Sequence, residues 1–103
     1  MDVPQALEDL LEELVDVQKA VNKLKTKSVS GGPLRKQMKD IYKRWLPISG
    51  VLESGNLVDA GQLQEVSDGW KRLVKLSEGV YLKTQYRPVL KSIITMTEGE
   101  LLH

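Results

Sequence analysis

Residues 6–24 read ALEDLLEELVDVQKAVNKL, and apolar side chains recur in this stretch at every third or fourth position. That spacing places them on one face of an α-helix. The apolar seam consists of Leu7, Leu10, Leu14, Val17, Val21 and Leu24, and it is widened by Ala6, Leu11 and Ala20. Asp2 stands where an N-cap residue belongs, Gln5 follows three positions later, and Pro4 is tolerated in a first turn. The pattern predicts a helix over residues 3–26, and the polar SVSGG segment at 28–32 predicts a loop after it.

A second seam follows with the same period. It consists of Leu34, Met38, Ile41, Trp45, Ile48 and Leu52. Pro33 occupies a position where proline suits the start of a helix, but Pro47 lies inside the pattern, where proline removes a hydrogen bond. Because the phase of the seam survives Pro47, we expect one helix over residues 34–53 with a kink near this proline. The alternative is a helix that ends at Leu46.

Two further seams complete the pattern. Asp59 is placed to cap a third helix, and Gly79 is a natural stop for it. Thr84 is placed to cap a fourth helix. The two seams are Leu63, Val66, Trp70 and Leu73, and then Tyr86, Leu90, Ile93 and Thr97. No segment shows a sustained strand alternation, so the sequence predicts an all-α, up-and-down four-helix bundle with a kinked second helix. We expect residues 1–103 to form a single domain, and this domain would suit the N-terminus of a longer protein.

Composition limits the chemistry of the chain. Its 103 residues include no Cys, and the only His is His103, so thiolate, disulfide and imidazole chemistry are not expected. The N-terminus is acidic and lacks the features of a signal peptide, and no apolar run approaches the length of a membrane span. We therefore expect a cytoplasmic, non-enzymatic protein without a cofactor or a bound metal.

Charge alternates in blocks along the chain. Residues 1–18 carry six acids and no base, whereas residues 19–45 carry nine bases and one acid, for a net +8. Residues 46–70 then carry −4, residues 71–91 carry +5, and the remainder carries −2. The whole chain has a formal charge of only +1. Such blocks suit internal pairing, head-to-tail assembly, or a basic patch that faces an anionic surface.

Several charged groups are candidates for a site. Carboxylates occur at helical spacing as Asp9/Glu12, Glu13/Asp16 and Glu65/Asp68, a faint similarity to the paired acids of helical nucleotide pyrophosphohydrolases; a solvated acidic face is the simpler interpretation. The second helix mixes bases with Tyr42 and Trp45, as some nucleic-acid-binding helices do, but Trp45 belongs to the core seam and nucleic acid is not the expected partner. A third group is basic and suits an anionic membrane; it comprises Lys71, Arg72, Lys75, Lys83, Arg87 and Lys91.

Three stretches carry a family resemblance. PLRKQMKDIYKRWLPI, residues 33–48, resembles the second helix of the plant RPW-type (powdery-mildew resistance) coiled-coil domain, in which a Pro-Leu opening is followed by Pro and an aliphatic residue at this spacing. LQEVSDGWKRLVKLSEG, residues 63–79, resembles its third helix. KTQYRPVLKSI, residues 83–93, looks like the opening of its fourth helix. The domain is similar in architecture to the bundles of mixed-lineage kinase domain-like proteins and of fungal HeLo proteins.

The resemblance implies a cell-death module of a plant immune receptor that self-associates and is recruited to the plasma membrane. It implies partners of three kinds: further copies of the chain, anionic phospholipids, and other domains of the receptor. The resemblance implies that Lys83, Arg87 and Lys91 contact the phospholipid head groups. Together with Lys71 and Arg72 from the basic group above, they are the expected membrane-binding residues. The first helix departs from the family because it is acidic, and its residues Glu8, Glu12 and Asp16 would attract cations at a pore mouth or simply form a solvated face. The alternative function is a helical protein–protein adaptor without membrane activity.

Overall fold

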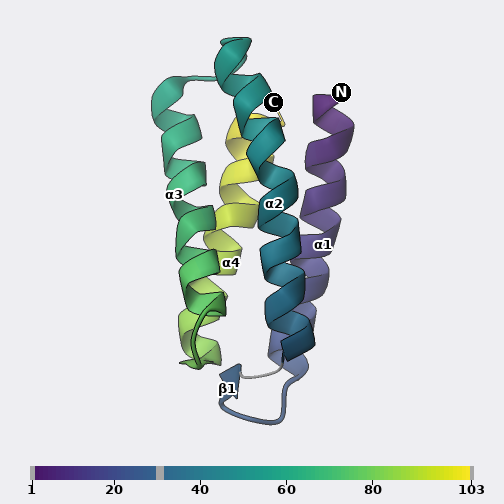
Figure 1. Cartoon of the computed structure of the whole chain (residues 1–103), viewed down its shortest axis with the longest axis vertical. Helices are drawn as coiled ribbons and strands as arrows, with labels where there is room; N and C mark the ends of the chain where they lie inside the picture. Colours follow the sequence, from purple (N-terminus) through teal and green to yellow (C-terminus); the bar gives the residue numbers. More distant parts are fainter. Residues whose placement is uncertain (1, 30–31, 103) are drawn as a thin grey trace.

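Four helices run alternately up and down in the computed structural model, which describes residues 2–29 and 32–102 (Figure 1). Their bounds are α1 Val3–Lys23, α2 Gly32–Ser54, α3 Ala60–Ser77 and α4 Lys83–Met96, and a π-helical turn, η1 Thr97–Leu101, extends α4. Two strands of two residues each, β1 Ser28–Val29 and β2 Tyr81–Leu82, lie in the links between helices. The predicted all-α four-helix bundle is confirmed.

The helix starts follow the predicted capping residues in two of three cases. Oδ1 of Asp2 accepts a hydrogen bond from the N–H of Gln5 at 3.1 Å, and Oδ2 of Asp59 accepts one from the N–H of Gln62 at 3.2 Å. The prediction that Thr84 caps the fourth helix is wrong. Helix α4 begins at Lys83, and Oε1 of Gln85 accepts a hydrogen bond from the N–H of its N-cap residue Leu82 at 2.8 Å.

Helix α2 continues through Pro47 as one element, so the alternative end at Leu46 is wrong. Five residues of the second seam are buried, and they lie on both sides of the proline: Met38, Ile41, Trp45, Ile48 and Leu52. A proline inside a helix costs about 3 kcal/mol or more through the lost hydrogen bond and the ring clash. Burial of the seam offsets that cost because each such side chain contributes about 1.5–3 kcal/mol.

The predicted seams form one core. Every residue of the four seams is buried except Leu24 and Leu34, which are half-buried against the core at the ends of their seams. The indole rings of Trp45 and Trp70 stack at the centre, with ring centroids 5.6 Å apart and planes inclined by 15°. The prediction that Trp45 serves the core is therefore confirmed, and this ring is not free to stack on a base.

A short β-bridge joins two links and was not predicted. Ser28 pairs with Leu82 and Val29 pairs with Tyr81 in antiparallel register, and Val29 is fully buried. The predicted end of the first helix at residue 26 is therefore wrong, and α1 ends at Lys23. The backbone has to become extended from Leu24 onward so that Ser28 and Val29 can pair with β2. The bridge ties the α1–α2 link to the α3–α4 link at one end of a bundle that measures 42 × 22 × 20 Å (Figure 1).

Candidate functional site

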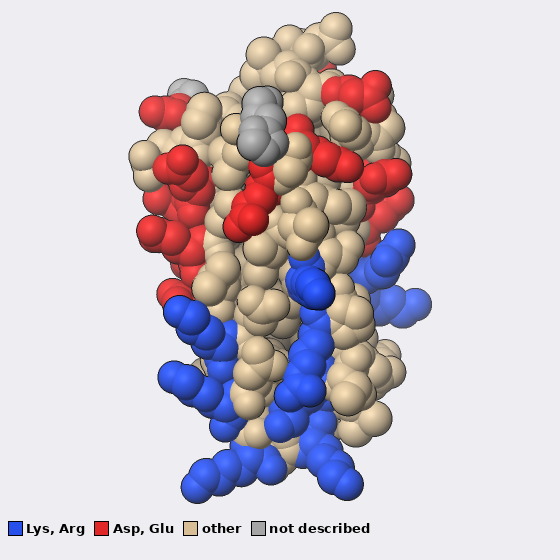
Figure 2. All heavy atoms as spheres, turned by 180° about the vertical axis from the view of Figure 1, so that it is seen from behind, with Lys and Arg blue, Asp and Glu red and all other residues tan. Residues whose placement is uncertain are grey.

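Charge is sorted by position along the bundle axis. Figure 2 shows acidic side chains toward one end and basic side chains toward the other, with a sharp boundary between them. We call the basic side chains the basic half: Lys19, Lys23, Lys25, Lys27, Arg35, Lys36, Lys39, Lys43, Arg44, Lys71, Arg72, Lys75, Lys83, Arg87 and Lys91. The acidic half contains Asp2, Glu8, Asp9, Glu12, Glu13, Asp16, Glu53, Asp59, Glu65, Asp68, Glu98 and Glu100.

The sorting follows from the way charge blocks and helix directions alternate together. Helices α1 and α3 begin acidic and end basic, whereas α2 and α4 begin basic and end acidic or neutral. Each reversal of the chain therefore brings like charges to the same end. Of the 14 acids only Asp40 and Glu78 fall among the 15 bases, which leaves a net +13 in the basic half and −12 in the acidic half.

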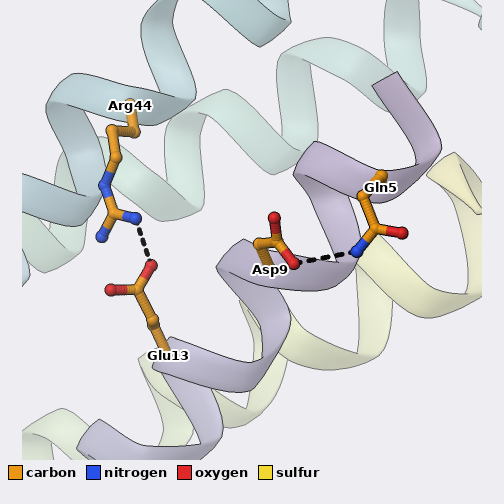
Figure 3. Close-up of polar contacts among 4 residues, drawn as sticks. All are labelled: Gln5, Asp9, Glu13 and Arg44. Atoms are coloured by element: carbon orange, nitrogen blue, oxygen red, sulfur yellow. Dashed lines mark hydrogen bonds and ion pairs between the residues drawn. The ribbon is translucent and has the colours of Figure 1, made fainter. Parts of the chain in front are cut away.

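Little of this charge is neutralised within the bundle. Among the described residues the structure contains a single ion pair, between Arg44 and Glu13 at the boundary of the two halves (Figure 3). The hydrogen bond to Glu13 raises the pKa of the Arg44 guanidinium, against the opposing effect of its partial burial. Internal pairing, one of the three interpretations of the charge blocks, is therefore not what the described part of the chain adopts.

Three bases hold the bundle together at its basic end. Nζ of Lys83 donates to the carbonyl of Leu24 at 2.6 Å, and Nε of Arg87 donates to Oδ1 of Asn22 at 2.9 Å. Nε of Arg35 donates to the carbonyl of Ser77 at 2.8 Å. The carbonyls of Leu24 and Ser77 lie at the C-terminal ends of α1 and α3, where a cation satisfies an unpaired acceptor and complements the helix dipole.

The predicted membrane-binding residues thus divide into two groups. Lys83 and Arg87 fasten α4 to α1 through the hydrogen bonds above. Lys71, Arg72 and Lys91 are exposed on the neighbouring helices α3 and α4, and all five belong to the basic half. Sequence reasoning left out five exposed lysines that the fold adds to the same end: Lys23, Lys25, Lys27, Lys36 and Lys39. The +8 block over residues 19–45 was the signal for them.

In the described part of the chain, the acidic residues are not grouped into a site for a metal ion. Glu8, Glu12 and Asp16 are exposed along one side of α1. One carboxylate of each predicted pair has another partner: Asp9 accepts from Nε2 of Gln5 at 3.0 Å and Glu13 pairs with Arg44 (Figure 3), and Asp68 accepts from Nε2 of Gln64 at 2.8 Å. Over residues 2–29 and 32–102, no three Asp, Glu, His or Cys side chains are grouped so that they could hold a metal ion.

No family model, curated protein or solved structure matches this chain. In the part of the chain that the structure describes, none of the helices combines the length and the apolar character that a membrane span requires.

Proposed function

We propose that this chain is a non-enzymatic signalling module of the immune, cell-death type, which self-associates and binds anionic membranes with its basic half. The inner face of the plasma membrane is the proposed target, and permeabilisation is the proposed outcome of assembly there. The observation that carries the proposal is the sorting of charge along the axis, which gives a protein of net charge +1 one strongly basic end.

The attraction of this molecule to an anionic membrane depends on where its charges lie and not on its net charge. Electrostatic interactions in physiological salt decay over about 8 Å, whereas the bundle is 42 Å long. A membrane that touches the basic end is therefore attracted by the bases close to it and is screened from the acidic end. The acids at the far end oppose the reverse orientation, so the proposal predicts end-on binding with the β1–β2 bridge toward the lipid.

The strength of the attraction can be estimated from the lysines nearest that end. Lys23, Lys25 and Lys27 lie in the last turn of α1 and in the link after it, and all three are exposed. Each base close to an anionic leaflet contributes about 1 kcal/mol. Loss of three such bases would weaken binding by about 3 kcal/mol, which corresponds to roughly a hundredfold.

The test compares two variants that lose the same charge. In the first, Lys23, Lys25 and Lys27 are changed to Gln at the basic end. In the second, Lys43, Lys71 and Lys91 are changed to Gln; these exposed lysines lie closer to the boundary between the halves. Lys83 and Arg87 are left intact because their substitution would also loosen α4 from α1. Co-sedimentation and dye leakage are measured with vesicles that contain phosphatidylinositol phosphates, and with neutral vesicles.

We expect the wild type to bind and permeabilise the anionic vesicles and to ignore the neutral ones. The end variant should lose roughly a hundredfold in affinity, and the boundary variant much less. Equal losses would contradict end-on binding. A wild type that ignores anionic vesicles at low salt would overturn the membrane proposal and favour the adaptor function, in which the charged halves recognise protein only.

A further inference from the structure

Two large apolar side chains are exposed at the basic end of the bundle. Val80 and Leu82 belong to the link between α3 and α4, and 63% and 49% of their surface is exposed to solvent. Tyr81 lies between them and packs against the core, and successive residues of an extended strand point to opposite faces. The β-bridge therefore directs Val80 and Leu82 away from the core. We call these two residues the apolar pair.

Bases surround the apolar pair. Lys25 and Lys27 are exposed in the link that contains β1. The N–H of Lys83 donates to the carbonyl of Lys27 at 2.8 Å, which places Lys27 beside the Leu82 end of the α3–α4 link. Figure 2 shows basic side chains spreading outward at this end of the molecule. The link from 78 to 82 adds one acid, Glu78, so the surroundings of the apolar pair are predominantly basic.

We propose that Val80 and Leu82 enter the head-group region of an anionic membrane and anchor the basic end of the bundle there. The inference deepens the proposed function and rests on it: the bases attract this end to the lipid surface, and the apolar pair then contacts the lipid itself. Lysine side chains are long enough to reach the head-group phosphates while shorter apolar side chains enter between the lipids. The partner is thus a lipid surface and not a soluble phosphate.

Charge decides which end of the bundle meets the lipid. The opposite end also exposes apolar surface, since Leu57 in the α2–α3 link is 61% exposed. Acids lie near it in the chain, Glu53 in α2 and Asp59 at the start of α3. An anionic leaflet repels these acids and attracts the bases of the other end. Exposed apolar surface therefore contacts the membrane at the basic end and not at the acidic end.

The apolar pair is held in place before any membrane is met. Pairing of β2 with β1 fixes the backbone at Leu82, whose N–H also donates to Oε1 of Gln85 at 2.8 Å. The next residue, Lys83, donates from Nζ to the carbonyl of Leu24 at 2.6 Å. A contact surface that is already ordered loses less conformational entropy on binding. The link can therefore present the pair without a preceding folding step.

The contributions of charge and of apolar contact respond differently to salt. Salt screens the attraction between the bases and the lipid, whereas the burial of apolar surface does not depend on screening. About half of the surface of each residue in the apolar pair is available for burial. Its loss from both residues should weaken binding by roughly thirtyfold at low and at high salt.

The first test removes the apolar pair without changing charge. The end variant carries Val80→Thr, which keeps the branched shape, and Leu82→Ser, which suits the N-cap position of α4. The matched control carries Val51→Thr and Leu57→Ser, the same two replacements at exposed positions toward the acidic end. In co-sedimentation with vesicles that contain phosphatidylinositol phosphates, the end variant should bind roughly thirtyfold more weakly than the wild type. The control should bind as the wild type does.

The second test detects entry into the lipid with a fluorophore, for which the chain is suited because it contains no Cys. Leu82→Cys and Leu57→Cys are each labelled with an environment-sensitive dye. On addition of the same vesicles, emission from position 82 should shift to shorter wavelength and be quenched by lipids that carry a nitroxide near the head group. Emission from position 57 should not change. Soluble inositol phosphate should cause no shift at either position.

The outcomes separate this inference from the function on which it rests. A wild type that binds the anionic vesicles without a shift at position 82, or with the same affinity as the end variant, would overturn the inference and leave membrane binding standing. A shift that appears without vesicles as the protein concentration rises would assign the apolar pair to contact between copies and would also overturn it. A wild type that binds no anionic vesicles would reject the membrane function and the inference together.

Discussion

At the scale of single residues, two helical glycines differ in the space around them: Gly69 lies at a close contact between helices and Gly50 does not. A Cβ atom on Gly69 would lie 3.1 Å from Cγ1 of Ile93, which is fully buried in α4, whereas a Cβ atom on Gly50 would meet no atom within 4 Å. Both glycines lie inside helices, where Ala is more favourable than Gly by about 1 kcal/mol. The two positions therefore separate helix propensity from packing.

We expect Gly50→Ala to raise the free energy of unfolding by up to about 1 kcal/mol. Gly69→Ala should lower it by about 1 kcal/mol, because a branched side chain sealed in the core cannot move aside and overpacking costs more than the gain in propensity. Urea unfolding followed by circular dichroism measures both. An equal gain at the two positions would mean that the α3–α4 contact relaxes freely.

Tyr86 links α4 to the end of α3. Its hydroxyl group donates to the carbonyl of Leu76 at 2.6 Å, and burial raises the pKa of the phenol above its ordinary value of 10.0. Because the folded state holds this proton more tightly than the unfolded chain, the contribution to stability is complete below about pH 10 and is lost as the pH rises from there through the folded pKa.

Tyr86→Phe should lower the free energy of unfolding at pH 7 by about 1 kcal/mol, since the carbonyl of Leu76 loses its donor. The variant should also lose less stability than the wild type between about pH 9 and about pH 11. Urea unfolding across this pH range tests both statements, with Tyr42→Phe as the control because the Tyr42 hydroxyl makes no hydrogen bond among the described residues. A wild-type slope unchanged in Tyr86→Phe would argue against the raised pKa.

At the scale of helices and links, the neighbouring bases Arg35 and Lys36 on α2 differ in whether they hydrogen-bond to another helix. Arg35 donates to the carbonyl of Ser77 at the end of α3, whereas Lys36 is exposed and makes no hydrogen bond or ion pair among the described residues. Arg35→Met should lower the free energy of unfolding by about 1.5 kcal/mol, because it removes a charge-assisted hydrogen bond and a cation at a helix C-terminus. Lys36→Met should change it by less than about 0.5 kcal/mol.

Thermal and urea unfolding of the two variants tests this assignment. Similar effects of Arg35→Met and Lys36→Met would mean that the α2–α3 hydrogen bond contributes nothing measurable. The comparison also matters for the membrane assay, since it identifies which bases can be changed without loosening the bundle.

Local periodicity explains which elements could be predicted. The seams around Leu14, Trp45, Leu73 and Leu90 predict four helices because apolar spacing is a property of neighbouring residues. The β1–β2 bridge could not be found this way: it pairs residues more than fifty positions apart, and two-residue strands carry no alternation. The same distant contact, in which the N–H of Lys83 donates to the carbonyl of Lys27 at 2.8 Å, moves the start of α4 ahead of Thr84.

The candidate site divides in the same manner. The charge blocks could be read from the sequence, and together with an up-and-down topology they predict a basic end. The sequence does not show which of these bases make hydrogen bonds inside the bundle. Nothing in the sequence around Lys83 and Arg87 distinguishes them from the exposed Lys91. The acceptors of their hydrogen bonds belong to α1 and to the link after it, about sixty positions earlier in the chain.

At the scale of the whole molecule, sorted charge has an energetic consequence. Surface charges of opposite sign usually alternate, and their weak attractions are reduced by salt. Here each charge has mostly neighbours of its own sign, so repulsion within the halves opposes the compact state. The apolar core must outweigh that repulsion. Salt should therefore stabilise the monomeric bundle, which is the opposite of its effect on a protein held by surface ion pairs.

Urea unfolding at protein concentrations low enough to keep the chain monomeric measures this effect. Between about 10 mM and about 0.5 M NaCl, over which the Debye length falls from about 30 Å to a few ångströms, we expect the free energy of unfolding of the wild type to rise.

The control exchanges two exposed charges on α3 through Glu65→Lys and Lys71→Glu, which keeps composition and net charge. It should be more stable than the wild type at low salt, by about 0.5 kcal/mol. The exchange turns the like-charge pairs at 65/68 and 71/75 into opposite-charge pairs, which outweighs the opposite-charge pair at 68/71 that becomes like-charged. Its response to NaCl should be smaller. If the wild type instead loses stability as NaCl is added, attraction between the halves outweighs repulsion within them, and the charge pattern would then serve the fold of the single bundle before it serves any partner.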